Sequence, residues 1–234
     1  MKTNQKGFTL VEIAIVLVII GLLLGGILKG QEMITQAKIK NIISDFSGIS
    51  AAFHGYQDRY RAVPGDDLGA AGRWTTAPAA VSGDGNGVVG GTTNVGSTYN
   101  ANCAPTPPTL ESCKWWDHLR RSGFVAGAGA NQPLNAVSGI VGVQTGDAAG
   151  GAVLGGVGGV NGFFGLIMCS ANHPDKVAIA TDTQMDDGNR TAGSVRGQLQ
   201  TANNPAIAVN ALTAPDANTY VESGTNTYAL CRLL

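Results

Sequence analysis

The chain opens with a short polar stretch, residues 1–7, and continues with an apolar run over 8–28 that a single charged residue, Glu12, interrupts. An α-helix rises 1.5 Å per residue, so this run makes about 30 Å of helix, enough to cross the hydrocarbon core of a bilayer. The residues Lys-Gly-Gln-Glu follow at 29–32, and no small-residue cleavage site of the secretory type appears there. The pattern therefore predicts a membrane-spanning helix over 8–28.

The charges that flank the run predict its orientation. Lys2 and Lys6 lie in the leading stretch, and positive residues favour the cytoplasmic side of a membrane. Lys29 on the other flank weakly opposes this bias. We therefore expect the amino terminus in the cytoplasm and everything after the run on the far side of the membrane.

An amphipathic stripe follows. Its apolar members are spaced alternately three and four residues apart, with lysine, aspartate, asparagine and arginine between them: Ile39, Ile42, Phe46, Ile49, Phe53, Tyr56 and Tyr60. This heptad-like spacing predicts a second helical segment over 29–62, continuous with the first and ended by Pro64-Gly65-Asp66-Asp67. The stripe suits packing onto the chain's own domain or a coiled-coil dimer, and the sequence leaves both open.

The remaining residues, 63–234, predict one exported globular domain that is rich in loops. We expect a short helix over 115–122, strands over 163–169 and 228–233, and one or two further short strands within 123–162. Residues 175–181 suit either a strand or the start of a helix. The expected fold class is α+β: a long amino-terminal helix packed on a small antiparallel β-sheet with long loops.

Composition and motifs argue against several classes of function. Charged residues make up 13% of the chain and the net charge is −1, which argues against a strongly electrostatic nucleic-acid partner. The three histidines are scattered, and no H-E-x-x-H or G-x-S-x-G motif occurs, so we expect no enzyme. Residues 85–90 match G-x-G-x-x-G, but they follow an acidic turn rather than a strand, which argues against a phosphate cradle.

Two acidic loops are candidate calcium sites, and in the first of them, residues 82–87, oxygen ligands alternate with glycines as at the start of a calcium loop. The first candidate set is Asp84 and Asn86, and the second is Asp182, Asp186 and Asp187. The first loop lacks the downstream glutamate of an EF-hand, and no calcium-binding motif aligns residue by residue with the second. Asp-Gly-Asn sequences also form turns without a metal, and the sequence leaves that alternative open. No other cofactor is expected.

The hexapeptide Gly7-Phe8-Thr9-Leu10-Val11-Glu12 resembles the processing site of type IV prepilins and type II secretion pseudopilins. The resemblance is close over about the first quarter of the chain. It implies that a dedicated membrane peptidase removes leader 1–7 by cutting between Gly7 and Phe8 and methylates the new amino terminus at Phe8. It also implies that Glu12 directs assembly by meeting the terminal amine of a neighbouring subunit.

Glu12 is unusual on physical grounds as well, because a charge inside a bilayer is costly and needs a partner. After cleavage, the amine of Phe8 would lie one helical turn away, so a pair within one chain is the simplest alternative to a pair between subunits. An ordinary signal anchor that tolerates a glutamate near its end is a further alternative.

The resemblance implies a subunit of a type IV pilus-like filament, held in the inner membrane with its carboxy-terminal domain in the periplasm. Its partners would be like or unlike filament subunits, the prepilin peptidase and methyltransferase, an inner-membrane assembly platform and the lipid bilayer. A type II secretion pseudopilin and a membrane-anchored periplasmic binding module or enzyme are the alternatives.

Many pilins carry a proline late in the apolar run, whereas this chain has glycines at 21, 25, 26 and 30. Glycines either weaken a helix or permit close helix packing.

The four cysteines of an exported chain suggest two disulfides, with three possible connectivities. Proximity along the sequence favours Cys103–Cys113 and Cys169–Cys231. The second bond would tie the carboxy-terminal segment to the sheet. No pair has C-x-x-C spacing, which argues against zinc or redox chemistry.

Overall fold

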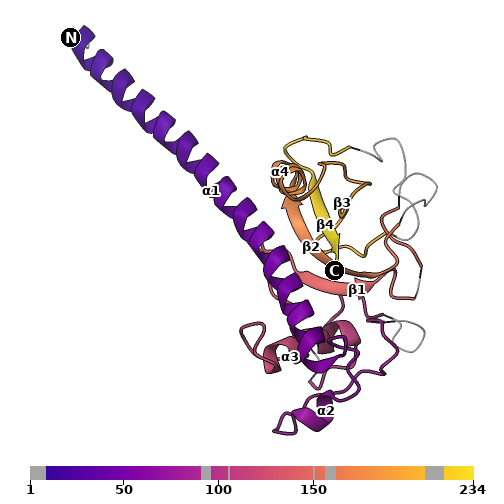
Figure 1. The fold of residues 1–234 in the computed structure, drawn as a ribbon. Coiled ribbons are helices and arrows are strands. Elements are labelled where there is room, and N and C mark those ends of the chain that lie inside the picture. Colours follow the sequence, from indigo (N-terminus) through magenta and orange to yellow (C-terminus); the bar gives the residue numbers. More distant parts are fainter. Residues whose placement is uncertain (1–8, 91–95, 105, 150, 156–161, 209–218) are drawn as a thin grey trace, which may run out of the picture. The chain divides into compact units, whose positions relative to one another are not determined.

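The structure is a computed structural model, and it describes residues 9–90, 96–104, 106–149, 151–155, 162–208 and 219–234 (Figure 1). The chain divides into two compact units, one ending at Lys38 and the other running from Ile39 to Leu234. Helix α1 (Leu10–Tyr60) begins in the first unit and ends in the second.

In the first unit, the predicted apolar run is helical without interruption from Leu10 onward, including its glycines. Its large apolar side chains are exposed, with Leu10 91% and Leu22 74% accessible. Within the described residues, α1 is the one helix long and apolar enough to cross a membrane. Such a surface is stable only when lipid or other protein covers it.

The second unit contains a four-stranded antiparallel sheet in the order β1-β2-β4-β3 (Figure 1). Its strands are β1 (Val141–Thr145), β2 (Leu166–Pro174), β3 (Val195–Leu199) and β4 (Thr227–Leu233). Helices α2 (Ala70–Arg73), α3 (Glu111–Arg121) and α4 (Asp175–Met185) complete the elements of the described chain. The α+β class expected from the sequence is confirmed.

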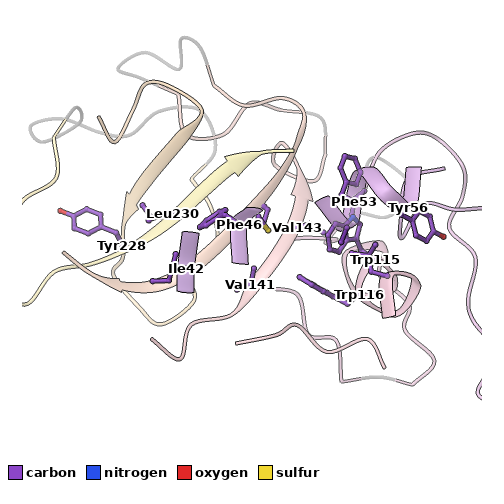
Figure 2. Packing of buried hydrophobic residues seen from close by; sticks show 14 of the residues in the cluster. Ile42, Phe46, Phe53, Tyr56, Trp115, Trp116, Val141, Val143, Tyr228 and Leu230 are labelled. Atoms are coloured by element: carbon purple, nitrogen blue, oxygen red, sulfur yellow. The ribbon is translucent and has the colours of Figure 1, made fainter. Parts of the chain in front are cut away.

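Both faces of the sheet are buried. Val143, Met168 and Leu230 point to one face and pack with Phe46 of α1 and Trp116 of α3 in a single apolar cluster (Figure 2). The alternate strand residues point to the other face, where loop residues cover them in a second cluster. That cluster comprises Tyr99, Val153, Leu154, Phe163, Ile167, Cys169, Ala171, Ile207, Ala229 and Cys231. The sheet thus lies between helices and loops, and its two central strands, β2 and β4, have apolar residues on both faces.

The amphipathic stripe packs on the chain's own domain, because Ile39, Ile42, Phe46, Phe53 and Tyr56 are all buried in the first cluster. A coiled-coil seam is therefore not needed to cover the stripe. α1 ends at Tyr60, just before the proline turn that was expected to stop it.

Several element boundaries differ from the predicted ones. β2 starts at Leu166 rather than at residue 163 and continues to Pro174, since β4 pairs with it as far as Thr227. Residues 175–181 form the start of α4, which follows β2 without a loop. α3 starts at Glu111 rather than at 115. Helix α2 and strand β3 were not predicted from the sequence.

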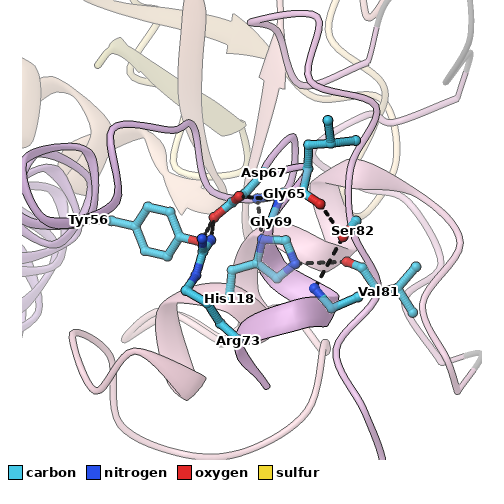
Figure 3. A network of polar contacts seen from close by, with 10 residues as sticks. Tyr56, Gly65, Asp67, Gly69, Arg73, Val81, Ser82 and His118 are labelled. Atoms are coloured by element: carbon cyan, nitrogen blue, oxygen red, sulfur yellow. Dashed lines mark hydrogen bonds and ion pairs between the residues drawn. The ribbon is translucent and has the colours of Figure 1, made fainter. Parts of the chain in front are cut away.

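A polar network closes the end of α1 (Figure 3). The buried Tyr56 hydroxyl donates to Asp67 at 2.5 Å, and Arg73 also bonds to this carboxylate. His118 of α3 accepts a hydrogen bond from the Gly65 N–H through Nδ1 at 3.0 Å, while its Nε2 lies 2.9 Å from the Val81 carbonyl oxygen. Because Nδ1 accepts, Nε2 carries the proton, and the imidazole is neutral.

Burial lowers the pKa of His118 to about 4. The unfolded chain takes up this proton near pH 6.5, so below that pH the histidine favours unfolding by up to about 1.4 kcal/mol per pH unit. We expect His118→Gln to lower the free energy of unfolding at pH 7. The difference in this free energy between wild type and variant should become smaller as pH falls from 6.5 to 4. Denaturation of the detergent-solubilised chain, followed by tryptophan fluorescence, measures this. His54→Gln, at an exposed site, is the matched control. A difference in free energy of unfolding between wild type and His118→Gln that stays constant with pH would contradict a buried, neutral His118.

Candidate functional site

The start of α1 is built around the Thr9 and Glu12 side chains. The Thr9 N–H and the Thr9 hydroxyl both donate to Oε2 of Glu12, each at 2.8 Å, and the Glu12 N–H donates back to the Thr9 hydroxyl oxygen at 3.3 Å. This reciprocal pattern is a capping box, which satisfies N–H groups that have no partner within the helix. Glu12 was predicted from the sequence to be a site residue, whereas Thr9 was not, although the S/T-x-x-E spacing of the two residues is typical of a capping box.

The capping box holds the Glu12 carboxylate at the very beginning of the helix. The side chain is exposed in the single chain, so a partner molecule can reach it. Gly7 and Phe8, the expected cleavage and methylation residues, lie outside the described residues.

A model of the prokaryotic N-terminal methylation motif matches residues 2–28. The chain carries a prepilin signal. This signal is that of type IV pilins and pseudopilins, and its match covers the leader, Glu12 and the apolar run. No curated protein and no solved structure matches the chain.

The prepilin signal has consequences for the class of protein. It indicates a structural subunit rather than an enzyme, and it implies processing by a peptidase and assembly into a filament. Together with the exposed apolar half of α1, it fits anchoring in the inner membrane with a periplasmic domain.

The structure pairs the cysteines in the way that sequence proximity favours. Cys103 bonds to Cys113 of α3, with 5.2 Å between the Cα atoms. Cys169 and Cys231 lie directly opposite each other on the two central strands and are also bonded. The second bond therefore fastens the last strand of the chain to the middle of the sheet, on the face covered by loops.

The first acidic loop wraps around two carboxylates that the sequence reasoning did not single out. The backbone N–H groups of Gly85, Asn86 and Gly87 all donate to Asp66, at 2.7–3.0 Å. The N–H groups of Asp84 and Gly90 donate to Glu111. The loop therefore does form an anion cradle, but the anions are the chain's own carboxylates.

The calcium candidates of this loop do not gather as expected. Asp84 lies with Asp66 and Glu111, the three carboxylates having oxygens within 4.8 Å of one another. The side-chain oxygen of Asn86 instead accepts the Val88 N–H at 2.9 Å, as in an Asx turn. Burial raises the pKa values of Asp66 and Glu111. Backbone N–H groups donate to both oxygens of Asp66 and to both oxygens of Glu111, so these hydrogen bonds alone explain the conformation of the loop.

The second acidic loop does bring its three candidates together. Asp182, Asp186 and Asp187 have carboxylate oxygens within 4.8 Å of one another. Burial is the main cause that raises the pKa of Asp182 to about 6, and the neighbouring Asp187 and Asp186 add to it. The Tyr220 hydroxyl and the Gly188 N–H act in the opposite direction.

Proposed function

We propose that this chain is a structural subunit of a type IV pilus-like filament. In this proposal it enters the inner membrane as a prepilin, is cleaved after Gly7, is N-methylated at Phe8 and assembles through Glu12. The observation that carries the proposal is the prepilin signal at 2–28, which continues into an exposed apolar helix and then into a packed globular unit.

The chemistry of assembly follows from the start of α1. The Glu12 carboxylate would accept a hydrogen bond from the methylated amine of Phe8 in a neighbouring subunit, which sets the register between the two helices. The capping box with Thr9 supports this role, because it limits the positions that the carboxylate can take. The exposed apolar residues of α1 would contact lipid before assembly and other α1 helices afterwards.

The partners in this proposal are further copies of the chain or other filament subunits, a peptidase with methyltransferase activity, and an assembly platform in the inner membrane. The same prepilin signal serves type II secretion pseudopilins, which form a short periplasmic filament, and that is the alternative. Immunogold labelling of intact cells separates the two, because only a pilus presents the globular unit outside the cell.

Mass spectrometry of the mature protein tests the processing step. We expect loss of residues 1–7 and an amino-terminal phenylalanine that carries one extra methyl group. Gly7→Leu blocks close approach of the peptidase at the cut, so this variant should keep its leader and remain in the membrane. Thr9→Ser leaves the cut site intact and serves as the processed control. A wild-type amino terminus other than Phe8 would overturn the proposal.

A further inference from the structure

A pocket of about 280 Å³ lies beside the carboxyl-terminal half of α3, between three loops. This volume is near the lower end of the range for small-molecule sites. Prolines, alanines and glycines make up most of the lining, and its polar members are Thr106, Asp117, Arg120 and Arg121. A mainly apolar wall with a few polar groups is the usual composition of a ligand site.

Two of the three loops are fastened to α3 by strong contacts. Segment 106–108 lies within the loop that the Cys103–Cys113 disulfide closes, and Cys113 belongs to α3. On the opposite wall, Arg121 donates through Nη2 to the Pro78 carbonyl oxygen at 2.6 Å. The walls are therefore formed before a ligand arrives, which lowers the entropic cost of binding.

Arg120 fastens the third loop and is itself held in one position. Its Nη1 donates to the Gly129 carbonyl oxygen at 2.8 Å, and its Cζ lies 5.7 Å from the Trp116 ring centroid. A Cβ atom at Gly127 would lie 3.4 Å from Nε, and the φ angle of 104° at this position favours glycine. The guanidinium group is thus a fixed part of the pocket wall.

The positive charge of Arg120 has no close counter-ion. Asp117, the carboxylate of the lining, instead binds Arg121, with 2.7 Å between Oδ2 and Nε. Among the described residues no carboxylate forms an ion pair with Arg120, and its Nε is buried without an acceptor. Burial lowers the pKa of Arg120, and Asp117 acts in the opposite direction. Two arginines and one aspartate leave the pocket with one net positive charge, and a partly desolvated charge without a partner is costly.

We propose that this pocket binds a small organic monocarboxylate with a compact apolar body, such as an aromatic acid. The carboxylate pairs with the Arg120 guanidinium, which matches it in charge and in geometry. The apolar body packs against the proline and alanine walls. An inorganic anion would leave these walls uncovered, whereas a neutral apolar molecule would leave Arg120 unpaired. The site lies within the globular unit and does not depend on filament assembly.

The test uses the full chain in nonionic detergent at pH 7.5 with 4-fluorobenzoate as the probe. Binding is followed by the ¹⁹F NMR line width and compared with detergent alone, and we expect saturable binding at one site. 4-Fluorobenzamide has the same ring without the charge, and fluoroacetate has the carboxylate without the ring. Each should bind at least about tenfold more weakly, because each lacks one of the two contributions.

Arg120→Gln should weaken 4-fluorobenzoate binding at least about tenfold, because the charge that pairs with the carboxylate is lost. Arg61→Gln is the matched control, since the Arg61 side chain is 83% exposed and lies outside this pocket, and it should bind like wild type. Three results would overturn the site: no saturable binding in wild type, equal binding of 4-fluorobenzamide, or unchanged binding in Arg120→Gln.

Arg120→Gln also loses the bond to Gly129, so a melting curve checks that the variant is folded. If it melts below wild type, photolabelling of the wild-type chain with 4-azidobenzoate decides. The label should lie on α3 or on segments 78–79, 106–108 and 127–130. A label elsewhere in the globular unit would count against the proposal.

Discussion

Glu12→Ala should remove the chain from filaments while leaving it anchored in the membrane. Without the carboxylate, the amine of Phe8 in the neighbouring subunit would be buried and unpaired, which costs about 3–5 kcal/mol at each contact. That cost lowers the affinity of each contact at least about a hundredfold. The variant also loses the capping box, but the loss of one helix cap costs only about 1 kcal/mol, so the apolar helix remains.

The measurement is the amount of chain in sheared filaments against the amount in the membrane fraction. Glu32→Ala is the matched control, because Glu32 lies on the same helix and forms only an exposed ion pair with Lys29. Thr9→Ala should reduce incorporation into filaments to an intermediate degree, because it keeps the Glu12 charge but removes the hydroxyl that donates to the Glu12 carboxylate. Normal incorporation of Glu12→Ala would instead favour a membrane-tethered binding module.

Phe46→Ala should destabilise the globular unit by about 3–5 kcal/mol, the usual cost of truncating a buried aromatic residue. Phe46 is 1% exposed and packs in the cluster that joins α1 to the sheet (Figure 2). The matched control is Phe164→Ala, because Phe164 is 64% exposed and should cost little. Urea denaturation of the detergent-solubilised chain measures both, and equal losses would show that α1 does not pack as described.

The sequence predicted α1 well because its signals are local. The apolar run, the stripe that starts at Ile39 and the proline turn each lie within a few residues of the structure that they specify. The strands were harder to predict. β3 contains Arg196, Gly197 and Gln198 between two apolar residues, which is a weak strand signal, and it forms because β4 supplies its pairing partner.

The acidic loops were also hard to predict, because carboxylates from distant parts of the sequence meet there in the fold. From sequence, Asp84 and Asn86 looked like ligands within one loop, whereas the structure brings Asp84 to Asp66 and Glu111 from other parts of the chain. Asp182, Asp186 and Asp187 gather as their spacing suggested, because one helical turn and a cap place them together. The hydrogen bond from the Tyr220 hydroxyl to Asp182 could not be foreseen, because Tyr220 lies 38 residues further along the chain.

The bond between Cys169 and Cys231 also has a mechanical consequence. A filament that is pulled transmits tension through its subunits, and a sheet under tension yields by separating neighbouring strands. The bond spans 62 residues of sequence, so about 200 Å of extended chain cannot be released by force. A loaded subunit can therefore lengthen only through the segments outside this loop, and its two central strands stay together until the covalent bond is reduced.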